Sequence, residues 1–352
     1  MQRVFLLTIL ILGSLAAFAE EVLGPAHYLK ILADSKLTYK MLSEPSKTPA
    51  DAARCGRRDE SMRIVMRDGK KALVPWPLAP EVKKLLDEGE SLYQSGKHAE
   101  AGEKFKAAIA ADPNVAASYF FYGDALLFGS KDAEGALAQY RKGIALDPTL
   151  PSGHFFASSA LSYLGRYDEA REEVIQALTF YPGYEVIWKI AERQPERWNA
   201  KPVVRHKFEP PAGYLGKKTD KGIDIYGGAD GQWLGYALCK AVWANEPKFR
   251  KERPNASTEI ERACVLNQIS SQYNRTHAQL EKEKKKTGKA EIVAAMPELE
   301  RHLVDVAESQ LLDGYILFEI MGQQCPLPLS MAGEDALKQI DGYIRKYVIV
   351  GK

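Results

Sequence analysis

Apolar positions recur at helical spacing along most of the chain, and three consecutive stretches repeat one order of small, aromatic and proline residues. The prolines that end them, Pro113, Pro148 and Pro182, are 35 and 34 residues apart. The extra residue of the second stretch falls between Gly123 and Ala136, where we expect a turn over 128–132. Small residues let two antiparallel helices approach, an aromatic ring fills the gap, and proline ends the second helix. The pattern predicts three stacked helix pairs, because one pair cannot bury its apolar face alone.

This pattern resembles the tetratricopeptide repeat family over residues 82–183. The matching residues are Gly89, Ala101, Phe105, Ala108 and Pro113, then Gly123, Ala136, Tyr140 and Pro148, and then Gly165, Tyr167, Ala170, Ala177 and Pro182. The chain departs from the family at Leu85, Tyr119 and His154, where Trp is frequent, and Ser158 replaces a glycine. The resemblance implies a mainly α fold with a tetratricopeptide-like α-α superhelix. An amphipathic helix from Tyr184 is expected to cap the stack, so this domain covers 82–194.

In the family, the first helix of each pair lines a concave groove. The positions carried over are Lys83, Leu86, Glu90, Tyr93 and Gln94 from the first pair, Phe120, Asp124, Leu127 and Phe128 from the second, and Phe155, Ser159, Ser162 and Tyr163 from the third. This surface is aromatic and carries few charges, which is typical of binding hot spots. The resemblance implies a groove for a peptide or helix. Because large apolar patches are rarely left bare, the alternative is that the chain's own N- or C-terminal segment covers these rings.

The flanking segments follow different patterns. Residues 20–81 predict a small N-terminal element with a helix over 25–42, an exposed loop over 44–59 and a hairpin around Asp68-Gly69. Residues 195–230 are rich in proline and glycine and predict a linker with a short strand over 223–226. Residues 231–352 predict a helical C-terminal domain. Its expected helices are 233–243, 257–286, 297–321 and 334–350.

The N-terminus has the pattern of a secretory signal peptide. Arg3 precedes a short apolar run, and small residues stand at Ala17 and Ala19, before Glu20. The run from Val4 to Ala19 is 16 residues, short of the roughly 20 that cross a bilayer as an uncleaved anchor. We therefore expect residues 1–19 to be cleaved and the mature chain to be periplasmic or secreted. No transmembrane segment is expected in the mature chain.

Four cysteines follow the signal, at Cys55, Cys239, Cys264 and Cys325. An even number in an exported chain favours disulfides, and four cysteines allow three pairings. Cys239 and Cys264 both fall in helical patterns, and we prefer a bond between them. Buried free thiols are the alternative.

Charge and candidate chemistry add little to this picture. Lys and Arg number 48 and Asp and Glu 46, so a net charge of +2 gives no case for nucleic acid. Glu298, His302 and Asp305 share one helix face at a spacing that could hold a metal or an acid/base pair, with His277 and Glu281 as candidates from a second helix. A solvated polar face explains the same residues. We therefore assign no catalytic residue, metal ligand or cofactor.

The sequence thus predicts an exported protein-interaction module or scaffold that binds a peptide or helix from a protein partner in an aromatic groove. One alternative is an enzyme whose site lies in the C-terminal helical domain. The other is a self-packed repeat protein that has no external ligand in its groove.

Overall fold

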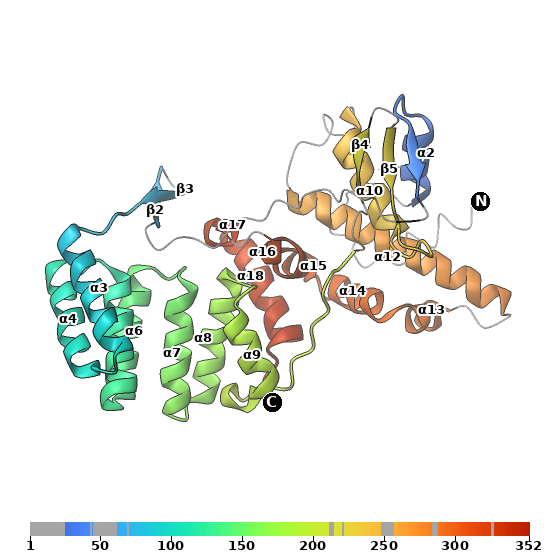
Figure 1. The fold of residues 1–352 in the computed structure, drawn as a ribbon. Helices are drawn as coiled ribbons and strands as arrows, with labels where there is room; N and C mark the ends of the chain where they lie inside the picture. The colour runs from blue at the N-terminus through green and yellow to red at the C-terminus, as the bar shows by residue number, and fades with distance from the viewer. Residues whose placement is uncertain are drawn as a thin grey trace. The chain divides into compact units, whose positions relative to one another are not determined.

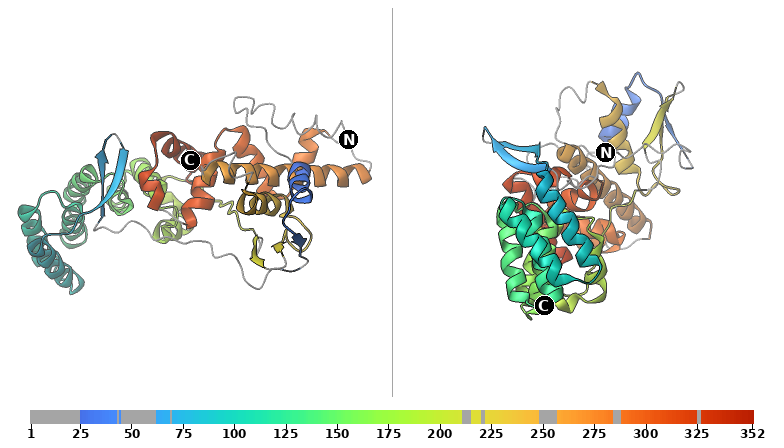
Figure 2. Two further views of the ribbon diagram at one scale, coloured as in Figure 1. Left: turned by 90° about the horizontal axis from the view of Figure 1, so that it is seen from above. Right: turned by 60° about the vertical axis from the view of Figure 1, so that its left-hand side comes forward.

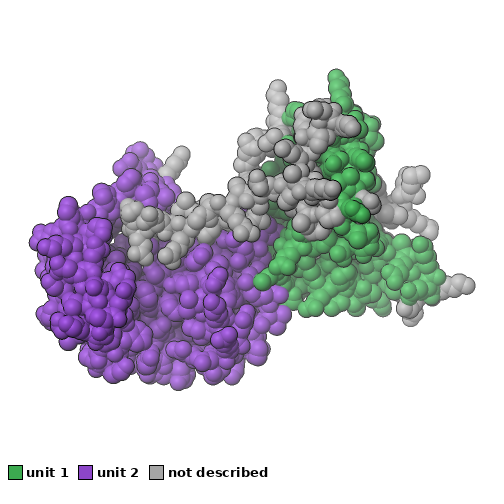
Figure 3. All heavy atoms as spheres, in the orientation of Figure 1, with its two compact units in different colours: residues 1–52, 206–316 green, residues 53–205, 317–352 purple. Residues whose placement is uncertain are grey.

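The computed structural model describes residues 25–42, 44, 62–68, 70–210, 215–219, 222–247, 257–283, 288–324 and 327–352. The chain is mainly helical (Figure 1). Its contacts divide it into two compact units, shown in Figure 3. Unit 1 combines residues 1–52 with 206–316, and unit 2 combines 53–205 with 317–352. No described helix is both long and apolar enough to span a bilayer.

Unit 2 contains the three predicted helix pairs, which stack side by side in Figures 1 and 2. The pairs are α3 (Pro80–Gln94) with α4 (His98–Ala111), α5 (Ala116–Asp124) with α6 (Ala133–Leu146), and α7 (Pro151–Tyr163) with α8 (Tyr167–Phe180). The expected α-α superhelical fold is confirmed.

Glycine and aromatic residues set the close approach within the first two pairs. A Cβ added at Gly89 would lie 2.4 Å from Cε1 of Phe105, and one at Gly123 would lie 2.3 Å from Cε1 of Tyr140. Both rings are fully buried. Only a residue without a side chain leaves the rings this space, so the packing depends on these glycines.

The extra residue of the second pair is accommodated differently from the expectation. We expected it in a turn over 128–132. Instead, α5 continues into a π-helical segment, η2 (Ala125–Ser130), which Lys131 ends in a left-handed conformation with φ of 60°. A π-helical turn takes up one residue more than an α-turn, so the insertion is absorbed within the helix.

The N-terminal part of unit 2 is the predicted β-hairpin. Strand β2 (Met62–Arg67) pairs antiparallel with β3 (Lys70–Pro75). The hairpin leans on the C-terminal helix α17 (Leu327–Met331), and Nζ of Lys71 donates a hydrogen bond to the Ala332 carbonyl at 2.7 Å. These contacts supply the support that an isolated hairpin lacks.

The C-terminal residues close the far end of the repeat stack. The repeats are followed by α9 (Glu185–Arg193) and η3 (Pro195–Trp198). The chain then passes through unit 1 and returns to the repeats with η4 (Ile316–Met321), α16 (Gly322–Gln324), α17, α18 (Glu334–Tyr343) and η5 (Ile344–Val348). Helix α18 packs on α8, and the Lys201 amide donates to the Val350 carbonyl at 2.8 Å. The contacts thus group residues 317–352 with the repeats, whereas the sequence pattern predicts one helical domain over 231–352.

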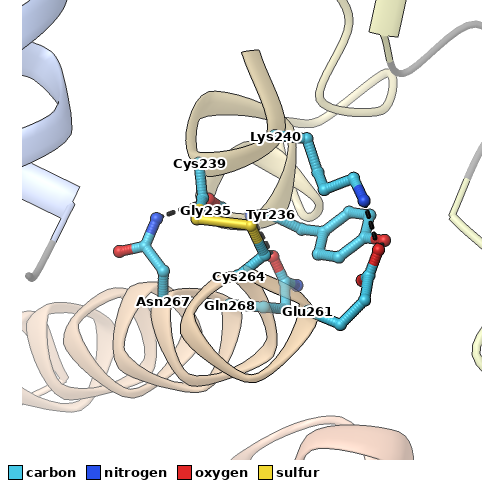
Figure 4. The surroundings of a disulfide bond; sticks show 8 residues. All are labelled: Gly235, Tyr236, Cys239, Lys240, Glu261, Cys264, Asn267 and Gln268. Carbon is cyan, nitrogen blue, oxygen red and sulfur yellow. Dashed lines mark hydrogen bonds and ion pairs between the residues drawn. A yellow bond between two sulfur atoms is a disulfide. The ribbon is translucent and has the colours of Figure 1, made fainter. Parts of the chain in front are cut away.

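Unit 1 is built around two helices joined by a disulfide. Cys239 on α10 (Leu234–Asn245) is bonded to Cys264 on α12 (Ser257–Lys282), with their Cα atoms 5.2 Å apart (Figure 4). This confirms the preferred pairing. Gly235 allows the close approach, because a Cβ there would lie 2.7 Å from the Asn267 carbonyl oxygen.

Shorter elements surround these two helices. They are α2 (Pro25–Ala33), β1 (Tyr39–Met41), β4 (Leu215–Thr219), β5 (Gly222–Ile225), α13 (Lys289–Ala295), α14 (Glu298–Glu308) and α15 (Leu312–Tyr315). The strands form a sheet in the order β1-β5-β4, with β1 parallel and β4 antiparallel to β5.

Two predicted helices are wrong in extent. The helix expected over 25–42 ends at Ala33, because the chain then extends as β1 to pair with β5. The helix expected over 297–321 is broken at Gln310, whose φ of 59° is incompatible with a right-handed helix. The predicted linker over 195–230 contains β4 and β5, and β5 confirms the expected strand. The signal peptide over 1–19 and most of the expected loop over 44–59 lie outside the described residues.

Candidate functional site

The ten candidate groove residues lie on the first helix of each pair or on its π-helical extension. We call them the candidate face. They are Lys83, Leu86, Glu90 and Tyr93 on α3, Phe120, Asp124 and Phe128 on α5 and η2, and Phe155, Ser159 and Tyr163 on α7.

A pocket of about 290 Å³ opens beside this face. Lys83, Leu86, Glu90 and Phe120 line it. The other walls come from the start of α5, the segment before α7, the β-hairpin and Trp76. We call it the hairpin pocket. The sequence predicts the hairpin but not its position beside the groove, because nothing in the hairpin's pattern indicates a tertiary contact.

Leu86 and Phe120 are walls of this pocket and also part of the core. They are 5% and 3% exposed. The Phe120 ring would lie 2.3 Å from a Cβ at Gly143 and 2.6 Å from one at Gly153. These two residues therefore hold the pairs together and present only an edge to a ligand.

The hairpin forms one wall of the pocket through Arg63. Its Nη2 donates to the Leu146 carbonyl at 3.3 Å, and its guanidinium carbon lies 4.8 Å from the centre of the Trp76 ring. Part of the chain's own N-terminal segment thus borders the candidate face. It leaves the pocket beside it open.

Two rings at the other end of the candidate face remain exposed. Phe128 is 38% and Tyr163 60% exposed, and their ring centres lie 6.2 Å apart with the planes at 83°. Phe155 is more enclosed, packing against Phe156 and Tyr184. The Ser159 hydroxyl donates to the Phe155 carbonyl at 3.1 Å. The face therefore offers an aromatic pair made by η2 and the end of α7.

The charged residues of the candidate face differ in their surroundings. Nζ of Lys83 lies 2.5 Å from Oδ2 of Asp87, so this cation is paired. Glu90 is exposed. Asp124 is partly buried and accepts a hydrogen bond from the Tyr140 hydroxyl at 2.6 Å. Burial raises the pKa of Asp124 to about 6 despite this bond. Burial and the nearby Asp124 carboxylate raise the pKa of Tyr93 to about 12.

The polar residues singled out on α14 do not converge on a site. Glu298 and Asp305 are exposed, whereas His302 is 8% exposed and stacks on His206, with ring centres 3.8 Å apart. Burial and, to a smaller extent, the neighbouring His206 lower the pKa of His302 to about 4. Among the described residues, no group of three His, Cys, Asp or Glu side chains is arranged to hold a metal ion.

Comparison with known proteins identifies the repeats. Residues 86–151 match the tetratricopeptide repeat family. The chain contains a tetratricopeptide repeat segment. Arrays of such repeats present extended binding surfaces, and the segment is accordingly a protein-interaction module.

Two solved structures resemble part of the chain. Both are of SycD from Yersinia enterocolitica, a type III secretion translocator chaperone, one in an alternative dimer and one with a peptide of the translocator YopD. Each is 20% identical to this chain with a TM-score of 0.31, and covers 34% of it and 91% or 92% of its own length. No curated protein matches the sequence.

Proposed function

We propose that this chain is an exported interaction module whose tetratricopeptide repeat segment binds a peptide or helix of a partner protein along the candidate face. The open hairpin pocket beside that face carries the proposal. Its volume is near the lower end of the roughly 300–1,000 Å³ of small-molecule pockets, which suits one or two large side chains of a polypeptide.

The exposed aromatic pair supports the same function. Phe128 and Tyr163 leave apolar ring surface in water, where it contributes nothing to folding. Aromatic side chains at a binding surface supply large contact area with few rotatable bonds, so covering them favours association. A partner lying along the face would contact the pocket with one part and the ring pair with another.

Export is supported by the signal-like N-terminus and by the Cys239–Cys264 bond, since disulfides persist in oxidising compartments. The native host should release a mature chain that begins at Glu20, which N-terminal sequencing of the periplasmic and secreted fractions can detect. A chain retained in the cytosol with Met1 in place would contradict export.

Site-specific crosslinking tests the binding function. We would place a photoreactive phenylalanine analogue at Tyr163 in the full chain and irradiate the native host. Tyr167, 45% exposed and the first residue of α8, is the matched control. We expect a discrete crosslinked polypeptide from position 163 and none from position 167.

Two outcomes would contradict the function. Equal crosslinking from both positions would show that the candidate face has no special role. A crosslink from position 163 only to the chain's own residues would favour the self-packed alternative.

A further inference from the structure

The charges beside the hairpin pocket carry an inference about the partner, which rests on the proposed function. We propose that the candidate face selects a basic amphipathic segment of the partner protein. One of its apolar side chains fills the hairpin pocket, and its Lys or Arg side chains pair with Glu90 and Asp124.

The balance of charge on the candidate face is negative. Its one cation, Lys83, is paired with Asp87. Arg63 adds a second cation to the wall of the hairpin pocket, but the carboxylates of Asp87, Glu90 and Asp147 in the same lining outnumber the two cations. Glu90 and Asp124 have hydrogen-bond donors in Gln94 and Tyr140, but no cation of the described residues lies within ion-pair distance of either. A basic ligand would supply the missing counter-charge.

Carboxylates on the second helices of the pairs have cations beside them, unlike Glu90 and Asp124. Glu103 on α4 lies 2.8 Å from Nζ of Lys106, and Glu169 on α8 lies 2.6 Å from Nη2 of Arg166. These surface charges are matched within the chain. The acidic residues of the candidate face are left for a partner, and complementary charge gives an interface its specificity.

Glu90 and Asp124 occupy equivalent places in successive repeats. Each follows the glycine that packs against an aromatic ring, Gly89 and Gly123 respectively. The third repeat has the neutral Ser159 there. Negative charge therefore lies along the first two repeats, where Glu90 also lines the hairpin pocket, and the most exposed ring, Tyr163, lies on the third, next to Phe128 at the end of the second. This gives the partner segment a direction, with its basic part at the first two repeats.

The surroundings of Asp124 give a second reason to expect a basic partner. Its partial burial removes water from the carboxylate, which raises its pKa and destabilises the charged form. An ammonium or guanidinium group beside it would replace the lost solvation. A residue that destabilises the free chain but stabilises a complex is expected at a binding site.

Three matched peptides test the proposal on the full, oxidised chain. The first, of about 14 residues, carries Leu and Phe at helical spacing and Lys elsewhere. The second replaces every Lys by Glu, and the third keeps Lys but replaces Leu and Phe by Ser. Fluorescence anisotropy measures the Kd of each. We expect the first to bind at least roughly tenfold more tightly than the other two, because it alone offers both the charge and the apolar side chains.

Charge reversal at the site is the second arm. Glu90→Lys should weaken binding of the first peptide by roughly five- to tenfold and improve binding of the second. Glu103→Lys, which changes the same charge on the exposed surface of α4, should leave both Kd values unchanged. Circular dichroism confirms that each variant is folded.

The outcomes separate this proposal from the proposed function. Equal binding of the first two peptides, or an unchanged Kd in Glu90→Lys, would overturn the basic preference. If the double variant Phe128→Ala with Tyr163→Ala nevertheless bound these peptides more weakly, the proposed groove function would stand without the basic preference. If the same double variant left the Kd of every peptide unchanged, both the basic preference and the proposed groove function would fail.

Discussion

Glycines decide how closely the two helices of a pair approach at the scale of single residues. Gly89 and Gly123 each face an aromatic ring across the pair, and the same order of residues allowed the repeats to be found in the sequence. Ser158 in the third pair shows that a small polar residue can also be accommodated, with its hydroxyl bonded to the Phe155 carbonyl. The packing requirement therefore explains the repeat pattern.

Gly123→Ala tests this requirement. The added Cβ would lie 2.3 Å from the buried Tyr140 ring, so we expect a loss of about 1–3 kcal/mol in the free energy of unfolding. Gly102→Ala is the control, because the nearest atom to its Cβ is 3.6 Å away and alanine favours a helix. Thermal unfolding should show a lower Tm for the first variant alone. Similar Tm values would contradict the account.

The stacked histidines of unit 1 predict a dependence of stability on pH. His302 has a folded-state pKa of about 4, held down by burial and by His206 and opposed by Asp305. Between the ordinary histidine pKa of about 6.5 and this value, the unfolded chain binds a proton that the folded chain does not. The contribution of His302 to the free energy of unfolding is present above pH 6.5 and is lost as the pH falls towards 4.

His302→Gln should therefore flatten the decline in stability between pH 7 and pH 4.5. The difference in free energy of unfolding should reach about 2 kcal/mol, from about 1.4 kcal/mol for each pKa unit. Unfolding by urea at several pH values measures it. An unchanged slope in His302→Gln would refute the assignment.

Whole elements differed in how far the sequence could predict them. The hairpin of β2 and β3 was predicted, because Asp68-Gly69 between apolar runs is a strong local signal. The end of α2 at Ala33 was not, because β1 exists only through pairing with β5, about 180 residues later. The π-helical η2 was also missed, since an insertion in a sequence does not reveal which turn absorbs it.

The disulfide between α10 and α12 gives a prediction for these elements. It closes a loop with a sequence separation of 25 residues, for which constraint of the unfolded chain contributes about 3 kcal/mol. Reduction should accelerate hydrogen exchange in α10 and α12. In the double variant Cys239→Ser with Cys264→Ser, hydrogen exchange in α10 and α12 should be fast even without reductant. Adding reductant should not accelerate it further. Exchange in α10 and α12 that is insensitive to reductant in the wild-type chain would contradict this.

At the scale of the whole molecule, the sequence predicted only part of the candidate site. Family resemblance located the ten residues of the candidate face, because helical spacing fixes which positions share a face. It could not show that Leu86 and Phe120 are mostly buried or that Arg63 and Trp76 border the same pocket. Those facts depend on contacts between segments that are distant in sequence or on the packing of neighbouring pairs.

The central claim is that a partner polypeptide lies along the candidate face of the repeat segment. Hydroxyl-radical footprinting tests it most directly, with the lysine-rich amphipathic peptide at a saturating concentration. We predict that oxidation of Trp76, Phe128 and Tyr163 falls several-fold, while oxidation of Tyr167, whose exposure lies between theirs, stays constant. Protection of Tyr167 to the same extent, or no protection of Phe128 and Tyr163, would contradict the account.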